Sequence, residues 1–275
     1  MIPAAFDYKK AGSSEEAIAL IVEHGDEAKL LAGGHSLIPM MKLRLAVPSV
    51  LVDIAGVEDL SYIDDRGDHI AIGALTKHRS LETSDLLIAE CPLLAHVASK
   101  VGDPQVRHRG TLGGSLAHSD PASDLPAAVL ALGGSLVAEG PNGQREIGVA
   151  DFFTGYFESA LSDDEMLTEV RVPKAPGASW SYQKFNRRAQ DWAIVGVAAV
   201  EVHGAAQIAL VNMGSTPLRA EAVEAALAGG AGAAEAAEAA ADGTDAPTDL
   251  NASPEYRDHL ARVLTKRALE ASGIS

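Results

Sequence analysis

Hydrophobic and polar positions along the chain follow two periods, and the changes between them divide it into three parts. In the first part, about residues 1–55, Ser13 and Glu16 precede apolar positions spaced as on one helix face, and Gly25 ends the pattern. Two short apolar runs, residues 29–32 and 49–54, are typical of buried strands. The pattern predicts a small β–loop–α–β subdomain.

The second part, about residues 56–176, mixes helical and strand patterns. Two pairs of apolar runs flank glycine-bearing turns at residues 64–68 and 140–143, which predicts two β-hairpins. We expect Thr76 to cap one helix and Pro92 to begin another. Residues 124–132 read as an apolar helix, and residues 169–172 as a strand that Pro173 ends. This part is therefore predicted to be α+β.

The third part, residues 177–275, combines strands with helices. Strands are expected at residues 181–185, 194–202 and 207–212, and a final helix begins after Ser253. An alanine-, glycine- and glutamate-rich tract at residues 229–243 is interpreted as a weak surface helix or a mobile loop. These elements predict a C-terminal α/β domain with a small antiparallel sheet and helices.

Composition narrows the classes of function. The chain has 275 residues, 47% of them hydrophobic and 22% charged, as expected for a soluble globular protein with a substantial core. Its formal net charge of −16 disfavours nucleic acid and anionic membranes as partners. No apolar run reaches transmembrane length, and residues 1–8 lack the pattern of a signal peptide, so we expect a cytoplasmic protein, associated with a membrane at most through a partner.

Several kinds of chemistry find no support in the sequence. Cys91 is the single cysteine, so the chain alone can build neither a disulfide nor an iron–sulfur cluster, and we interpret Cys91 as a small buried hydrophobe. No phosphate-binding P-loop, zinc-protease, nucleophile-elbow or paired CxxC motif occurs. The spacing of His35, His96, His108 and His118 matches no helix-borne metal pair. We therefore expect no metal site and no catalytic side chain.

Two similar segments, residues 29–36 and 109–115, carry the main signal. In each, an apolar or β-branched lead-in reaches a Gly-Gly pair that a small hydroxyl residue follows or nearly follows. Glycine tolerates positive φ and close approach, and consecutive amides in such a turn form an anion-binding nest. Ser36 would also cap a helix over residues 37–41. A single Gly-Gly step is usually only a tight turn, but the pair favours two loops that hold the pyrophosphate and ribityl chain of one dinucleotide.

Asp124 follows the second of these loops and has two interpretations. Its carboxylate would accept hydrogen bonds from ribose or ribityl hydroxyls, or it would cap the helix that begins there. One residue is able to serve both purposes. The two glycine-rich loops and Asp124 together resemble the FAD-binding medium subunits of molybdenum hydroxylases (the xanthine dehydrogenase family), most closely the aerobic carbon monoxide dehydrogenase type. The likeness spans nearly the whole chain and includes residues 184–188 and 191–195.

The resemblance implies an FAD-binding region of the vanillyl-alcohol-oxidase (PCMH) type in two subdomains, residues 1–55 and 56–176, followed by the C-terminal domain. It also implies a set of FAD-contacting residues. The diphosphate and ribityl chain would be lined by Leu30, Leu31, Ala32, Gly33, Gly34, His35, Ser36, Leu37, Thr111, Leu112, Gly113, Gly114 and Ser115. Further contacts would come from Val101, Asp124, Leu167 and Lys184. Trp192 would cover the isoalloxazine, or else pack in the core at the start of a strand.

The same resemblance implies partners. The molybdenum cofactor and the [2Fe–2S] clusters would belong to a large and a small subunit, in a dimer of heterotrimers. FAD on this chain would take electrons from a partner cluster and pass them to quinone, cytochrome or oxygen. Two alternatives stay open: a free-standing flavin oxidase or reductase of the same fold, and a cofactor-free scaffold. The reducing substrate, whether carbon monoxide, a purine, an aldehyde or an N-heterocycle, is not determined by this chain.

Overall fold

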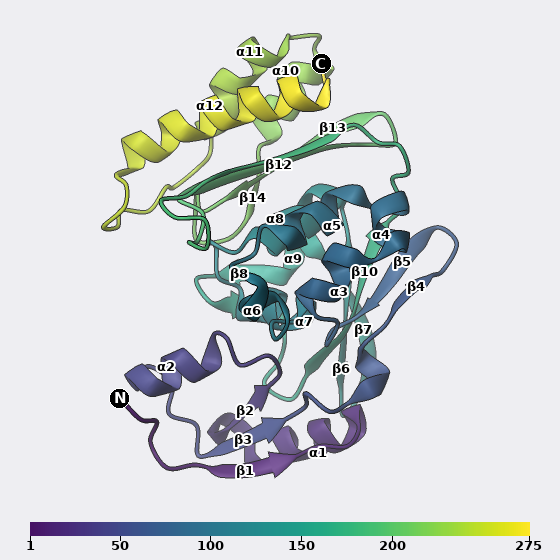
Figure 1. The fold of residues 1–275 in the computed structure, drawn as a ribbon, viewed down its shortest axis with the longest axis vertical. Helices are drawn as coiled ribbons and strands as arrows, with labels where there is room; N and C mark the ends of the chain where they lie inside the picture. Colours follow the sequence, from purple (N-terminus) through teal and green to yellow (C-terminus); the bar gives the residue numbers. More distant parts are fainter.

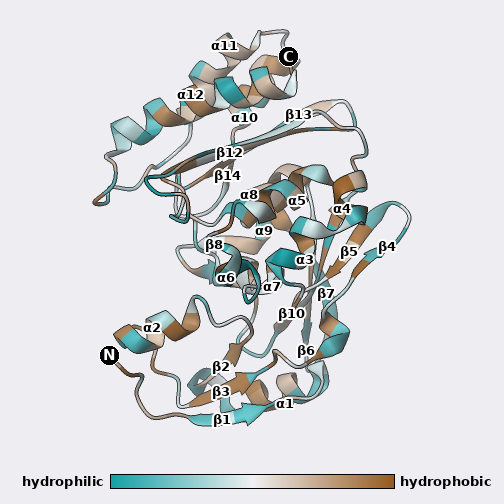
Figure 2. Ribbon diagram, in the orientation of Figure 1, coloured by the Kyte–Doolittle hydropathy of each residue, from teal (hydrophilic) through white to brown (hydrophobic).

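A computed structural model describes all residues from 1 to 275. Its first sheet is parallel, with β3 (Val50–Asp53) between β1 (Asp7–Lys10) and β2 (Ala28–Leu31). The helix α1 (Ser14–His24) packs on this sheet, and the Ser13 hydroxyl accepts a hydrogen bond from the Glu16 amide, as predicted for its cap. β1 was not predicted, because all four of its residues are exposed and it lacks an apolar pattern (Figure 2).

The second sheet has five antiparallel strands in the order β4-β5-β10-β6-β7. These are β4 (Ile63–Asp65), β5 (His69–Gly73), β6 (Ser135–Gly140), β7 (Gly143–Gly148) and β10 (Met166–Pro173), so both predicted hairpins are confirmed. The helices of this region are α3 (His78–Thr83), α4 (Asp85–Glu90), α5 (Pro92–Ser99), α6 (Pro104–Arg107), α7 (Leu112–His118), α8 (Asp124–Leu132) and α9 (Val149–Phe152). Short elements complete it: η2 (Glu58–Leu60) before the sheet, and β8 (Phe153–Gly155) paired with β9 (Glu158–Ser159). A further short helix, η1 (Gly25–Glu27), lies in the first region between α1 and β2.

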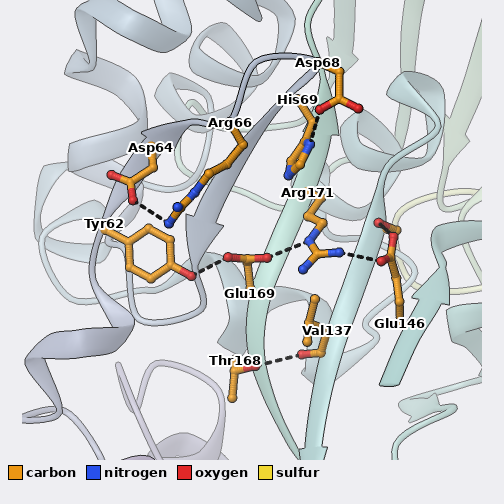
Figure 3. Close-up of polar contacts among 11 residues, drawn as sticks. Tyr62, Asp64, Arg66, Asp68, His69, Val137, Glu146, Thr168, Glu169 and Arg171 are labelled. Atoms are coloured by element: carbon orange, nitrogen blue, oxygen red, sulfur yellow. Dashed lines mark hydrogen bonds and ion pairs between the residues drawn. The ribbon is translucent and has the colours of Figure 1, made fainter. Parts of the chain in front are cut away.

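The two faces of β10 have opposite characters. Val170 and Val172 point into the core that the sheet shares with the helices. Glu169 and Arg171 lie on the other face, where the Tyr62 hydroxyl donates to Glu169 at 2.6 Å and the Arg171 Nε donates to the same carboxylate at 2.6 Å (Figure 3). This alternation follows from the two-residue period of a strand. The network braces the sheet on the side away from the helices.

The third sheet is antiparallel, in the order β11-β12-β13-β14. Its strands are β11 (Trp180–Phe185), β12 (Val195–Val202), β13 (Ala205–Val211) and β14 (Leu218–Arg219). One face packs on α8, and α10 (Glu221–Ala228) and α12 (Pro254–Ser272) cover the other (Figure 1). All nine residues of α8 are buried because the helix lies between two sheets, which explains why it is apolar all round. The predicted α+β class with a small C-terminal sheet is confirmed.

Several local predictions need correction. Thr76 does not cap a helix: α3 begins at His78, and the Thr76 hydroxyl donates to the Tyr62 carbonyl at 2.9 Å instead. The alanine-rich tract is a helical surface segment and not a loop, and one of its faces is buried. It forms α11 (Ala233–Ala236) and η3 (Ala237–Ala241), which bury Ala236, Ala237 and Ala240 beside α10 and α12, while the glycines and glutamates of the tract stay exposed. Alanine there permits close helix packing, which composition alone does not reveal.

Other predictions agree with the structure. Cys91 is fully buried, and burial raises the pKa of its thiol to about 12, so it behaves as a small hydrophobe. Pro92 occupies the first turn of α5, as predicted. None of the helices has both the length and the apolar character needed to cross a bilayer.

Candidate functional site

A cavity of about 810 Å³ lies between the N-terminal sheet and the helices of the second region, and one wall comes from the C-terminal domain. Figure 1 shows the two sides, with α2 (Leu37–Leu43) and β2 facing α6 and α7. Of the residues that the resemblance assigns to FAD, only Leu31 and Leu112 do not line it. Leu112 is instead fully buried in the core. The volume is within the range of small-molecule and cofactor sites.

The two glycine-rich loops meet at this cavity. A Cβ on Gly33 would lie 2.4 Å from the Arg109 carbonyl oxygen and 2.9 Å from the Gly110 Cα. Both neighbours are backbone atoms, so a side chain at this position would push the loops apart. The prediction that the two segments converge is therefore confirmed, and the absence of a side chain at Gly33 is what permits it.

The first loop presents unused donors. Gly34 adopts φ +76°, and none of the amide N–H groups of residues 33–37 has a backbone acceptor within the chain. Ser36 occupies the cap position of α2, but its side chain makes no capping hydrogen bond, contrary to expectation. Consecutive free amides around a positive-φ residue form a concavity that favours an anion. This loop has the geometry predicted for a nest.

The second loop has a different construction, and the prediction of a second nest is wrong. Thr111 caps α7 by accepting from the Gly114 amide at 3.2 Å. The amides of Leu112 and Gly113 donate to the carbonyls of Thr76 and Ala74 at 2.9 and 2.8 Å. These donors are consumed in holding α7 against the strand end, so the Thr111 amide, which has no acceptor within the chain, is the one backbone donor of residues 111–115 left for a ligand.

The glycines of the second loop also have a packing role. A Cβ on Gly113 would lie 2.5 Å from the Ala74 Cβ and 2.8 Å from the Ala74 carbonyl oxygen, whereas one on Gly114 would approach only the Thr111 hydroxyl closely, at 2.7 Å. Neither residue has positive φ. Gly113 is therefore needed for close approach between α7 and the segment after β5, and not for backbone freedom.

The wall from the C-terminal domain carries a buried ion pair. Lys184 on β11 donates to Asp124 at 2.8 Å, and the Tyr182 hydroxyl donates to the other Asp124 oxygen at 2.5 Å. Asp124 begins α8 but does not cap it, because its carboxylate is held by these two groups. Burial raises the pKa of Asp124, and the Lys184 charge opposes that rise. Lys184 also donates to the Lys100 carbonyl at 3.1 Å.

Sequence reasoning missed Tyr182. The signal was present, since residues two apart on a strand share a face, and Lys184 on the same predicted strand was already a candidate. What the pattern did not reveal is that Asp124, nearly 60 residues earlier, lies opposite that face. Tyr182 and Asp124 together tie the C-terminal domain to the helices of the second region.

Trp192 lies at the mouth of the cavity. Its side chain is 57% exposed, so the alternative role in core packing is wrong. The backbone just after it is anchored from the C-terminal domain: the Ala193 carbonyl accepts from Asn212 at 2.8 Å, and the Ile194 carbonyl accepts from the fully buried Arg257 of α12. Arg257 was also missed, because it sits in a charged helical pattern typical of a surface.

His78, at the start of α3, is a further cavity residue that the sequence did not single out. Its amide donates to the Gly110 carbonyl at 3.0 Å, which places it directly beside the second loop. Burial lowers the pKa of its imidazole to about 4, so the side chain is neutral at pH 7. No cluster of three His, Cys, Asp or Glu side chains is close enough to hold a metal ion.

Comparisons with known proteins identify one family for the whole chain. Residues 4–175 match the family model of the FAD binding domain in molybdopterin dehydrogenase, and residues 180–272 match that of the CO dehydrogenase flavoprotein C-terminal domain. The carbon monoxide dehydrogenase medium chain of Hydrogenophaga pseudoflava is 42% identical over 99% of this chain and 98% of its own length. Subunit alpha of the 6-hydroxypseudooxynicotine dehydrogenase complex of Paenarthrobacter nicotinovorans is 38% identical over 98% of this chain and 95% of its own.

Solved structures show the same likeness. A chain of the Hydrogenophaga pseudoflava carbon monoxide dehydrogenase that lacks the Mo-pyranopterin moiety superposes with a TM-score of 0.96 at 43% identity, covering 99% of both chains. A chain of quinoline 2-oxidoreductase from Pseudomonas putida 86 superposes with a TM-score of 0.92 at 32% identity, again over 99% of both. The similarity thus covers both the fold and the full length, while the substrates named for these relatives differ.

Proposed function

The chain belongs to the family of FAD-binding subunits of the molybdopterin dehydrogenases, and from that premise we propose that it is the FAD-carrying electron-transfer subunit of a carbon monoxide dehydrogenase-like molybdenum hydroxylase. Its relatives are oxidoreductase subunits, which agrees with the family inferred from the two glycine-rich loops. Substrate oxidation would take place on a partner subunit, so the chain itself needs no catalytic side chain.

The residues present fit FAD. The free amides of residues 33–37 supply local positive potential for a diphosphate, which matters on a chain of net charge −16. Asp124 and Lys184 offer an acceptor and a donor on the opposite wall, and Trp192 offers an aromatic face at the mouth. When bound, FAD supplies the redox chemistry by accepting electrons from a partner [2Fe–2S] cluster and delivering them to quinone, cytochrome or oxygen.

The proposal includes the assembly. A large subunit would carry the molybdenum cofactor and a small subunit the [2Fe–2S] clusters, in a dimer of heterotrimers. The single cysteine supports this division, because a cluster normally needs several thiolates. We also propose a cytoplasmic location, with association at the inner face of the membrane when the electron acceptor is located there. The division into FAD-binding subdomains 1–55 and 56–176 and a C-terminal domain 177–275 is part of the same proposal, and the three main sheets support it.

One observation carries the proposal: the open amides of the first loop lie directly against the second loop, joined at Gly33. The test is FAD titration of the stripped full-length chain, followed by absorbance and by quenching of flavin fluorescence. We expect one FAD per chain. Gly33→Ala should weaken binding about 100-fold, because its Cβ must displace the Arg109 carbonyl.

Gly148→Ala is the matched control, since Gly148 lies outside the cavity and its Cβ would meet nothing closer than an Asp151 carboxylate oxygen at 3.6 Å. It should leave the dissociation constant within about threefold of the unmodified chain. A chain without flavin bands after FAD addition, or full retention of FAD by Gly33→Ala, would contradict the proposal. Purification from native cells gives a second readout: two further subunits are expected, whereas a lone yellow chain that oxidises its own substrate would indicate a free-standing flavoenzyme.

A further inference from the structure

The imidazole of His78 is buried where the two loops meet. The side chain is only 4% exposed, yet His78 lines the cavity. The position that a Cβ would take on Gly110 lies 2.7 Å from both Cδ2 and Nε2 of the ring. Gly110 in turn lies against Gly33, so the Nε2 edge of His78 is close to the loop that carries the free amides.

The two ring nitrogens have different surroundings. Nδ1 is inaccessible and has no hydrogen-bond partner. Nε2 also makes no hydrogen bond within the chain, but it is not among the inaccessible atoms and is the nitrogen that still reaches the cavity. A buried N–H without an acceptor is costly, whereas an unpaired lone pair is tolerated more often. The ring is therefore expected to carry its proton on Nε2.

The charged and titratable groups around the ring favour the neutral form. His35 approaches from the first loop, and Arg107 approaches from α6, where it is paired with Glu82 of α3 at 3.0 Å. Burial, with smaller contributions from His35 and Arg107, lowers the pKa of His78 to about 4. An imidazolium would in addition place a proton on the inaccessible Nδ1.

We propose that His78 is a further cofactor-binding residue, whose neutral imidazole donates a hydrogen bond from Nε2 to a diphosphate oxygen of FAD. The inference rests on the proposed function, because it takes the anion at the first loop to be the FAD diphosphate. His78 would complete a donor set to which the second loop contributes the Thr111 amide but none from residues 112–115.

The first test compares FAD dissociation constants of three variants of the stripped full-length chain. His78→Leu keeps a similar volume without a donor and should weaken binding about 10- to 100-fold, as expected for a lost hydrogen bond to a charged group. His78→Gln places an amide N–H where Nε2 stands and should remain within about threefold of the unmodified chain. His96→Gln, at a histidine whose ring packs at a tilt against Trp180 outside the cavity, should leave the dissociation constant unchanged.

The pH dependence separates a neutral donor from a cation. His35 and His118 also line the cavity, so the informative quantity is the ratio of the His78→Leu dissociation constant to that of the unmodified chain. A neutral donor keeps this ratio constant from about pH 6 to 8. A ratio that grows as the pH falls would show binding by an imidazolium and would overturn the proposal.

A direct measurement observes the tautomer in the unmodified chain. In the ¹⁵N-histidine spectrum, with the His78 signals assigned by their loss in His78→Gln, we expect a protonated Nε2 and a bare Nδ1 both before and after FAD addition. The opposite tautomer, or unchanged FAD affinity in His78→Leu, would overturn the role of His78 alone. A chain that binds no FAD at all would overturn the proposed function as well.

Discussion

The two glycine-rich loops look alike in sequence and differ in what they do. Residues 33–37 leave their amides without backbone acceptors around a glycine with positive φ. Residues 112–115 use every amide inside the chain, in the first turn of a capped helix. The first loop is built to hold a ligand through its backbone, and the second is built to hold the protein together beside that ligand.

The comparison teaches that a Gly-Gly pair indicates positions where a side chain is not tolerated. The pair does not reveal whether the reason is backbone conformation or close packing. Gly34 meets a conformational need, and Gly33 permits contact between the loops, while Gly113 lets α7 approach Ala74. The second side of the cavity therefore acts through side chains, chiefly the Asp124–Lys184 pair. Mutations on that side should act mainly on stability, whereas those in the first loop should act mainly on binding.

The largest effect should come from Lys184→Met, which leaves the Asp124 carboxylate buried without its cation. The side chains are 9% and 5% exposed, and breaking such a pair costs about 3–5 kcal/mol in the free energy of unfolding. Urea unfolding at several pH values checks it. Because burial holds the folded-state pKa of Asp124 above its unfolded value, stability contributed by its protonated form is lost as the pH rises through that pKa.

Lys184→Met should raise that pKa further, so its cost should be greatest near neutral pH and shrink on acidification. The double variant Lys184→Met/Asp124→Asn should recover much of the lost free energy of unfolding, because it also removes the buried charge. Lys266→Met, at an exposed lysine 3.8 Å from Glu270, is the control and should change stability by less than about 0.5 kcal/mol. Equal effects of the two lysine variants would show that the pair does not support this wall.

Gly113→Ala should have the next largest effect. Its Cβ would overlap the Ala74 backbone and side chain, and overpacking of this kind typically costs about 1–3 kcal/mol. The unfolding midpoint of the FAD-free chain measures it, so that ligand affinity does not enter. Gly114→Ala meets mainly the Thr111 hydroxyl and should cost less than about 1 kcal/mol. If Gly113→Ala were as stable as the unmodified chain, the second loop would not have the packing role assigned to it.

The smallest effect on the free energy of unfolding is expected at Thr111 and Ser36, the hydroxyl residues that precede α7 and α2. Thr111→Ala removes a capping hydrogen bond to Gly114 and should cost about 1 kcal/mol. Ser36→Ala removes none and should change the free energy of unfolding by less than about 0.5 kcal/mol. Thermal unfolding of the FAD-free variants provides the comparison. A greater loss in Ser36→Ala than in Thr111→Ala would mean that the first loop, too, depends on its cap.

Much of the fold was predictable from local pattern. The helix before Gly25, the strands that lead into and follow the first loop, both hairpins of the second region and the C-terminal strands all have periodic apolar positions. Where the prediction failed, local pattern carried no information. β1 is polar and exposed, and one face of the alanine-rich tract is buried only because α10 and α12 lie beside it.

For the site, local chemistry was enough to identify two side-chain-poor segments and the acidic and basic residues near them, because glycine and charge have the same properties in any context. Which amides remain free depends on whether a carbonyl from elsewhere in the chain lies within about 3 Å, as those of Ala74 and Thr76 do for the second loop. The partners of Asp124, the bond from Arg257 to the Ile194 carbonyl and the burial of His78 likewise depend on positions distant in the chain. Packing alone settled these, because desolvation and hydrogen-bond satisfaction are properties of a neighbourhood and not of a residue type.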